Sequence, residues 1–128
     1  MITGFLEIKM TPNKGRGVFA SADIEAGAII EESPVIVLNE EERRLVEKTI
    51  LNDYIFEWGD SGEKACMALG YIALYNHSSH SNCEYEMDFD LQIMRVKTMR
   101  FVNRSEELTV NYNGDWNNDK PVWFDERE

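Results

Sequence analysis

LYNHSSHSNCEYE, residues 74–86, is the stretch that most constrains the fold and function of this chain, because it gathers both histidines and one of the two cysteines. Small polar side chains separate these residues. Three kinds of site fit such a pattern: a metal centre, a nucleophilic catalytic centre, or a polar turn whose side chains bond the local backbone. The sequence on either side of the stretch helps to choose among them.

Zinc binding is the first of these possibilities. His77, His80 and Cys83 recur at every third position, and Cys66 would complete a set of four residues of ligand type. However, sulfur ligands of structural zinc sites usually come in close pairs such as C-x2-C, and the two cysteines lie far apart in the sequence. The spacing therefore favours a polar turn over a zinc centre, and we expect no metal.

A catalytic nucleophile is the second possibility, with Cys83 beside His80 or Ser78 beside His77. Such a pair also needs a third group that orients the base, together with an oxyanion hole. Neighbouring positions in the sequence establish neither of these, so a nucleophilic site is the weaker interpretation.

The composition predicts one domain over residues 1–128 and excludes several classes of partner. The 13 Lys and Arg residues against 24 Asp and Glu give a net charge of −11, which repels nucleic acid phosphates and anionic lipids and attracts basic polypeptides. No apolar run approaches the ~18 residues of a membrane span, and the start lacks an export signal. We expect a soluble cytoplasmic protein that binds neither nucleic acid nor membrane, and whose β-rich edge allows a homodimer.

Short apolar runs, several of them alternating with polar residues, predict a chain dominated by strands. The expected strands lie in residues 5–10, 18–20, 28–38, 83–102 and 107–112. The run 83–102 contains two strands around a turn near Asp88–Asp90. Pro34 cannot donate to a β-ladder, so we expect an edge or a break there.

One helix interrupts this pattern. Asn39 can cap the segment EEERRLVEKTILNDYIFEW, residues 40–58, whose first glutamates suit the positive end of a helix dipole. Leu45, Ile50 and Leu51 are expected on its buried side. Residues 68–78 are apolar but broken by Gly70, which predicts short strands or helical turns. The fold class is therefore mostly β with a helical insertion (α+β), because strands do not alternate with long helices.

NKGRGVFA, residues 13–20, is a glycine loop that taken alone indicates little. Gly15 and Gly17 flank Arg16 without the Lys-Ser or Lys-Thr ending of a P-loop, and no G-x-G-x-x-G opens a helix here. Glycine allows close approach of a ligand to the backbone, but it serves any tight turn equally well.

The order of several motifs carries a resemblance that none of them carries alone. The chain resembles the SET-domain family of protein lysine methyltransferases, most closely its small stand-alone viral and bacterial members, from about residue 5 to residue 123. The matching motifs are the glycine loop before VFA, DYIF at 53–56, ALGYIALYNHS at 68–78 with Asn82 beyond it, and EELTVNY at 106–112. The resemblance implies a β-clip-like fold of short strands with a C-terminal pseudoknot.

The resemblance also implies a cofactor, S-adenosylmethionine, and assigns residues to it. The glycine loop would lie along the cofactor, the Asn76 side chain and His77 backbone would hold its amino acid and adenine parts, and His80 and Cys83 would be bystanders. Tyr112 would be the catalytic tyrosine. Tyr54 would act together with Tyr112 and form part of the wall of the narrow channel through which the substrate lysine reaches the cofactor. The glycine-loop residues implied are Lys14, Arg16, Gly17, Val18 and Phe19.

Two departures from the family pattern stand out. Asn111 precedes the implied catalytic tyrosine where many members carry aspartate. The cysteine-rich zinc tail of many nuclear members is absent, and residues 113–128 form a short tail without zinc ligands of that type. Trp116, Trp123 or Phe124 could fold over the cofactor or channel in its place, or could pack on the core.

The implied function is transfer of a methyl group from S-adenosylmethionine to the ε-amine of a lysine in a basic protein, such as a histone tail. Residues 40–64 would be a helical insert that shapes the substrate groove, and acidic residues outnumber basic ones there. Such a face attracts lysine- and arginine-rich peptides. The alternative is a catalytically inactive SET-like module that only binds basic peptides.

Overall fold

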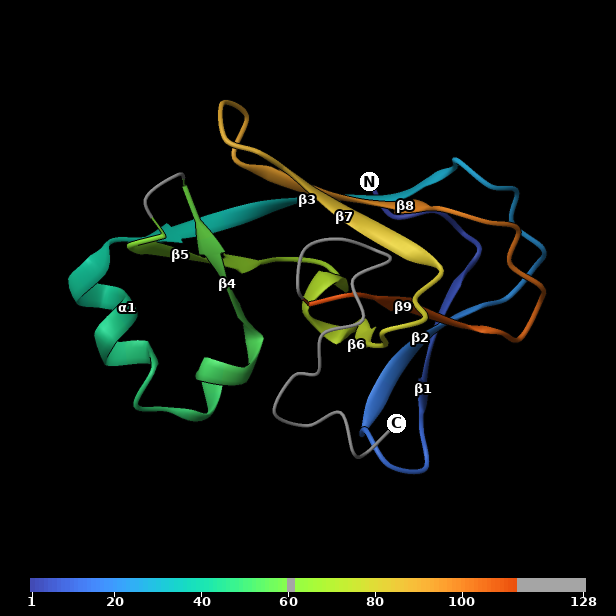
Figure 1. Cartoon of the computed structure of the whole chain (residues 1–128), viewed down its shortest axis with the longest axis horizontal. Helices are drawn as coiled ribbons and strands as arrows, with labels where there is room; N and C mark the ends of the chain where they lie inside the picture. Colours follow the sequence, from blue (N-terminus) through green and yellow to red (C-terminus); the bar gives the residue numbers. More distant parts are fainter. Residues whose placement is uncertain (60–61, 113–128) are drawn as a thin grey trace.

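The computed structural model describes residues 1–59 and 62–112 and folds them into two β-sheets flanked by helical segments (Figure 1). The strands are β1 (Leu6–Met10), β2 (Arg16–Ala20), β3 (Ile29–Leu38), β4 (Ile55–Trp58), β5 (Lys64–Ala68), β6 (Asn76–His77), β7 (Cys83–Asp88), β8 (Ile93–Thr98) and β9 (Glu107–Val110). The helical segments are α1 (Glu40–Val46) and two 3-10 turns, η1 (Ile50–Tyr54) and η2 (Ile72–Leu74). The predicted fold class is confirmed.

The four-stranded sheet, in the order β1-β2-β9-β6, brings distant parts of the sequence together. β2 pairs antiparallel with β9, where Val18 lies opposite Leu108. On its other edge β9 runs parallel to β6, with Asn76 opposite Thr109 and His77 opposite Val110. β9, the last described strand, is therefore held between the β1–β2 hairpin, which carries the glycine loop, and residues 76–78, called the NHS segment below. The functional residues were expected in these segments.

Asn82 holds β9 in this position. Its buried side chain donates to the Glu107 carbonyl at 2.8 Å and accepts from the Thr109 amide at 2.9 Å. These bonds join the loop after β6 to the strand that passes beside it, as a pseudoknot requires. The part of the expected pseudoknot beyond residue 112 lies outside the described residues.

The five-stranded sheet, in the order β4-β5-β3-β8-β7, is built around the long strand β3. Of the edge or break expected at Pro34, the break is wrong, because β3 continues through it from Ile29 to Leu38, whereas Pro34 does lie at the end of a ladder. The ladder partner changes there: β3 pairs with β8 as far as Pro34 and with β5 from Val35 onward. The Pro34 carbonyl still accepts from the Leu69 amide, so only the missing N–H of proline is lost to the sheet.

The helix predicted over residues 40–58 is too long. Asn39 does cap α1, with Asn39 Oδ1 accepting from the Glu42 amide at 2.8 Å and Glu42 Oε1 accepting from the Asn39 amide. The helix ends at Val46, and residues 55–58 form strand β4 instead, because their side chains suit a ladder with β5.

The burial predicted for the helix is also wrong. Leu45, Ile50 and Leu51 are exposed, with relative accessibilities of 59%, 76% and 43%, and no residue of α1 is buried. The 3.6-residue period that would gather them on one face does not continue, since α1 stops before Ile50 and η1 begins there.

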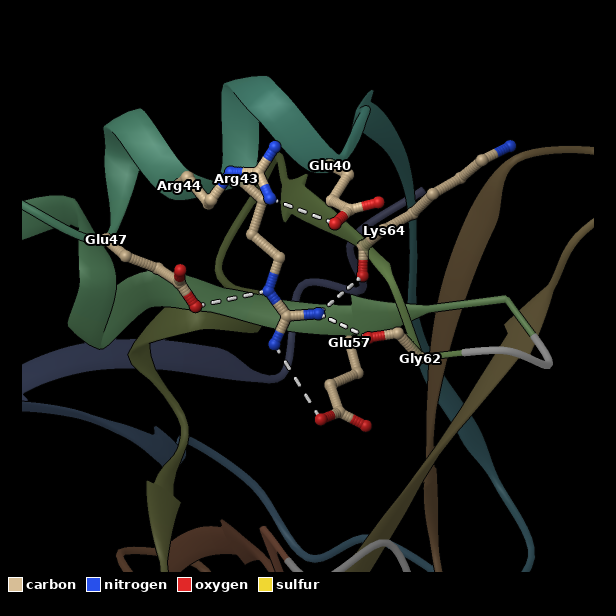
Figure 2. A network of polar contacts seen from close by, with 7 residues as sticks. All are labelled: Glu40, Arg43, Arg44, Glu47, Glu57, Gly62 and Lys64. Carbon is tan, nitrogen blue, oxygen red and sulfur yellow. Dashed lines mark hydrogen bonds and ion pairs between the residues drawn. The ribbon is translucent and has the colours of Figure 1, made fainter.

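Arg43 fastens α1 to the β4–β5 hairpin, as Figure 2 shows. Its guanidinium pairs with Glu47 at 3.2 Å and with Glu57 at 3.7 Å. It also donates to the carbonyls of Gly62 at 2.6 Å and Lys64 at 3.1 Å. Five donors in one planar group let a single side chain join helix, strand and turn, which fixes α1 against the β4–β5 hairpin.

One apolar core serves both sheets. Its buried members include Val18 and Leu108 from the smaller sheet and Ile30, Met94 and Val96 from the larger. The two strands predicted within residues 83–102 are confirmed as β7 and β8, as are the short elements of residues 68–78. Within residues 1–59 and 62–112, no helix has both the length and the apolar character to cross a membrane.

Candidate active site

A cavity of about 940 Å³ opens where the glycine loop, the insert and the NHS segment meet. The glycine-loop wall carries Lys14 and Arg16. The insert contributes the consecutive residues 52–57, and the remaining wall carries Asn76 and Tyr112. The glycine loop, Asn76 and Tyr112 come together because the β1–β2 hairpin and β9 share a sheet with β6, whereas residues 52–57 reach the same hollow from η1 and from β4 of the other sheet.

Tyr112 is fixed at both its backbone and its hydroxyl. Its amide donates to His77 Nδ1 at 3.0 Å, and its hydroxyl donates to the Tyr75 carbonyl at 2.7 Å. The rings of His77 and Tyr112 lie 5.3 Å apart and are tilted by 50°. Burial raises the pKa of the Tyr112 phenol above its ordinary value of 10.0, and the neighbouring Tyr85 and Glu107 raise it further. The hydroxyl is therefore neutral at physiological pH.

Asn76 joins the NHS segment to the glycine loop. Its Nδ2 donates to the Arg16 carbonyl at 3.1 Å and to Glu107 Oε2 at 2.8 Å. Gly17 lies against the same groups: a Cβ there would come within 2.6 Å of Glu107 Oε2 and 2.9 Å of Asn76 Nδ2. The absence of a side chain at Gly17 thus lets the loop approach Asn76 closely, and this is the specific reason for glycine at this position.

The charged residues that line the cavity come from two segments of the chain. Lys14 and Arg16 supply positive charge from the glycine loop, and Lys14 Nζ donates to the His77 carbonyl at 3.0 Å. Asp53 and Glu57 supply negative charge from the insert. Such a division suits two ligands of opposite character, an anionic group near the loop and a cationic group near the insert.

The predicted site residues fall into three groups. Lys14, Arg16, Tyr54, Asn76 and Tyr112 line the cavity. The others that the structure describes do not line it: Gly17 packs against Asn76, Val18 lies in the core, Phe19 has Lys9 Nζ 5.4 Å from its ring centroid, and buried His77 packs against Tyr112. Trp116, Trp123 and Phe124 lie outside the described residues, so their roles stay predictions.

The structure does not bring the four residues of the zinc interpretation together. Cys66 and Cys83 are buried free thiols, whereas His80 lies near the surface beside Ser79. Among residues 1–59 and 62–112 there is no group of three His, Cys, Asp or Glu side chains placed to hold a metal ion.

The nucleophile interpretation fails for Cys83 as well. Burial raises the pKa of its thiol to about 12, so the thiol stays protonated at neutral pH. The thiolate is the nucleophilic form of cysteine, and burial in apolar surroundings suppresses it. The NHS segment is instead a structural junction whose side chains hold the loop, β9 and Tyr112.

Two further aromatic residues line the cavity that sequence reasoning did not assign to it. Tyr85 from β7 and Phe56 from β4 do so, with ring centroids 5.4 Å apart. Burial raises the pKa of Tyr85 to about 12. Met87 also lines the cavity, and the alternation of Tyr85 and Met87 along one strand was the available signal that they share a face. What the strand would face could not be read from that alternation.

Comparison with known proteins identifies the class to which this fold and site belong. A sequence model of the SET domain matches residues 15–113, most of the chain. The chain therefore belongs to the SET-domain family.

Two individual proteins make the relationship more specific. The chain is 36% identical over 122 residues to the "Histone-lysine N-methyltransferase, H3 lysine-37 specific" of Schizosaccharomyces pombe, a match that covers 94% of this chain and 78% of that protein. It also resembles the crystal structure of a candidate histone methyltransferase from Plasmodium falciparum, with a TM-score of 0.67 and 26% identity. That likeness covers 90% of this chain and 98% of the other.

These findings confirm the predicted family and enzyme class: the chain is a protein lysine N-methyltransferase. The alternative interpretation, an inactive module that only binds basic peptides, gains no support from them.

Proposed function

We propose that this enzyme transfers a methyl group from S-adenosylmethionine to the ε-amine of a lysine in a basic protein segment of histone type. The observation that carries the proposal is the neutral Tyr112 hydroxyl, held on the Tyr75 carbonyl at the junction of the glycine loop, the NHS segment and the insert. The cofactor would lie at the glycine-loop end of the cavity, and the substrate lysine would enter past the insert.

The residues of the glycine-loop end fit S-adenosylmethionine. Lys14 and Arg16 offer positive charge to a carboxylate, and Gly15 between them also lines the cavity. The cavity volume lies within the range typical of ligand pockets, roughly 300–1,000 Å³. When bound, S-adenosylmethionine supplies a methyl group on a sulfonium sulfur, which a neutral amine can displace.

The substrate lysine must lose its proton before it can react. With a pKa near 10.4, about one lysine in a thousand is neutral at pH 7.4, which corresponds to a cost of roughly 4 kcal/mol. The aromatic residues Tyr54, Phe56 and Tyr85 line the cavity and exclude water from part of it, which disfavours the ammonium form. These walls therefore lower the pKa of the lysine that lies among them.

Tyr112 aims the neutral amine. Its hydroxyl proton is donated to the Tyr75 carbonyl, so the oxygen lone pairs are the part of the group that can accept from an amine N–H. Accepting one N–H fixes the direction of the nitrogen lone pair, and displacement at a methyl group requires nucleophile, carbon and sulfur in line. The residue therefore acts by orientation as a neutral phenol.

The pH dependence of catalysis follows from these two groups. We expect kcat/KM to rise about tenfold per pH unit from pH 7, because the fraction of neutral lysine rises with pH until its pKa is reached. Tyr112 should add no descending limb below pH 10, since its pKa is raised and the phenol is still protonated there. Initial rates between pH 6.5 and about 10 measure this. A descending limb in that range that disappears in Tyr112→Phe would contradict the assignment.

The substrate class follows from the acidic end of the cavity and from the Schizosaccharomyces pombe relative, whose name states that it acts on histone H3. Asp53 and Glu57 lie where residues flanking the target lysine would pass, and their carboxylates favour flanking lysine or arginine. Surface charge attraction of this kind weakens as salt screens it.

Neutralising this end should weaken binding of a basic peptide. For Asp53→Asn we expect KM for a histone H3 tail peptide to rise about fivefold at low salt with little change in kcat, and the difference to shrink at high salt. Steady-state kinetics at two ionic strengths measure the effect. Glu41→Gln, an equal charge change on exposed α1, is the control and should behave as the unmodified chain. Equal effects of both variants would mean that net charge alone is responsible.

The proposed activity is tested by radiolabelled methyl transfer from S-adenosylmethionine to full-length histone H3. We expect label on H3 but none on an acidic protein of similar size. Failure to label H3 while labelling a different basic protein would retain the reaction and overturn the histone assignment.

A further inference from the structure

Glu31 of β3 is a carboxylate with no solvent exposure, and the site described so far does not use it. Its Oε2 accepts from Ser33 Oγ at 2.7 Å and from the Tyr71 amide at 2.8 Å. Its Oε1 accepts from the Tyr75 hydroxyl at 3.1 Å. A buried carboxylate is costly unless it is fully hydrogen-bonded, so these three donors are what allow it to stay there.

Two of these donors mark the ends of the same short element. Tyr71 is the N-cap residue of η2, with no side-chain capping bond of its own, and Tyr75 is the C-cap residue. Glu31 therefore bonds both ends of η2 with its two oxygens. A 3-10 turn this short has little stability by itself, so an external clamp decides where it lies.

Gly70 makes room for this clamp. Its φ is +69°, and a Cβ there would collide with Glu31 Oε2 and Ser33 Oγ. The chain thus approaches the carboxylate as closely as a backbone can, directly before η2 begins.

η2 and the residue that follows it lie at the reacting end of the site. Ala73 and Leu74 line the cavity, and the next carbonyl along the chain, that of Tyr75, accepts the hydroxyl of Tyr112. Tyr75 is therefore held by its side chain on Glu31 while its backbone holds Tyr112. The two bonds lie on one residue that is almost fully buried, with 1% exposure, so a shift of its ring shifts the carbonyl too.

We propose that Glu31 is a positioning residue: by clamping both ends of η2 it fixes the Tyr75 carbonyl, and through it the direction of the Tyr112 hydroxyl. The role of Tyr112 rests on the proposed function, whereas the Glu31–Tyr75–Tyr112 linkage itself does not. Orientation matters because a small misplacement of the group that aims the nucleophile lowers the reaction rate far more than it weakens ligand binding.

The main test is Tyr75→Phe, which keeps the ring and backbone and removes only the donor to Glu31. We expect kcat to fall about tenfold, with the affinity for S-adenosylmethionine changed less than twofold. In protein labelled with 13C at the tyrosine ζ carbon, the Tyr112 signal, assigned by its loss in Tyr112→Phe, should shift. Thr98→Val removes a buried hydroxyl that bonds Glu25 and Ala28 instead, and is the control for stability loss alone.

Glu31→Gln tests the same linkage by changing the acceptor instead of the donor. Because Glu31→Gln also weakens the bond to the Tyr71 amide, we expect adding it to Tyr75→Phe to lower kcat further, but by less than Glu31→Gln lowers kcat in the unmodified chain, since both changes disrupt the Glu31–Tyr75 bond. Multiplicative effects of the two changes would overturn the proposal. So would a folded Tyr75→Phe variant in which either kcat or the Tyr112 signal is unchanged. Should the unmodified chain transfer no methyl group, the proposed function fails, and the NMR shift still decides whether Glu31 positions Tyr112.

Discussion

Tyr112→Phe is expected to lower kcat about a hundredfold while leaving the affinity for S-adenosylmethionine within about threefold, because it removes one preorganised hydroxyl from the reacting centre. A hundredfold loss corresponds to roughly 2.7 kcal/mol of transition-state stabilisation. The aromatic ring stays, and with it the contact to His77 and the backbone bond to His77 Nδ1. Single-turnover rates with saturating cofactor and peptide, beside calorimetric titration of the cofactor, measure the two quantities separately.

Tyr85→Phe is the matched comparison for this prediction. This variant also removes one phenol hydroxyl from the lining of the cavity. The Tyr85 ring keeps its contact with Phe56 when the hydroxyl is lost. We expect its kcat to fall less than tenfold. Equal losses in the two variants would mean that Tyr112 has no special place in the reaction.

Asn76→Ala should weaken S-adenosylmethionine binding about thirtyfold or more. The change removes the two bonds from Nδ2 that join the Arg16 carbonyl to Glu107, and it leaves the Glu107 carboxylate without that donor. The glycine loop would then lose its fixed distance from the NHS segment. Calorimetric titration of the purified variant measures the affinity, and its thermal unfolding curve shows whether the fold persists.

Asn52→Ala is the control for the loss of cofactor binding. Asn52 lines the same cavity but lies on the insert, at the end assigned to the substrate. We expect its affinity for S-adenosylmethionine to stay within twofold of that of the unmodified chain. A similar loss in both variants would place the cofactor elsewhere than at the glycine loop.

The sequence pattern was sufficient for the strands and insufficient for the insert. Alternation located β1, β7 and β8, because half-buried strands repeat every second residue. It gave too long a helix over residues 40–58, since the pairing of β4 with β5 outweighed the helical pattern. At Pro34, the missing N–H predicted an edge or a break, and the strand instead continues while one ladder ends there and another begins.

Site residues were predictable to the extent that they lie in motifs. Asn76 and Tyr112 stand in NHS and ELTVNY, and the structure brings them to one cavity. Tyr85 and Glu31 stand in no such motif, and their relation to the site depends on pairing between strands that the sequence does not specify. The Glu31 carboxylate in particular bonds Tyr71 and Tyr75, which lie 40 and 44 residues further along the sequence.

This chain is expected to place a methyl group on the ε-nitrogen of lysine. The most direct measurement is tandem mass spectrometry of a histone H3 tail peptide after incubation with the purified chain and S-adenosylmethionine bearing a deuterated methyl group. We predict labelled methyl on lysine, with the signal reduced about a hundredfold by Tyr112→Phe. Label on another residue type, or an unlabelled peptide from a folded chain that binds the cofactor, would contradict it.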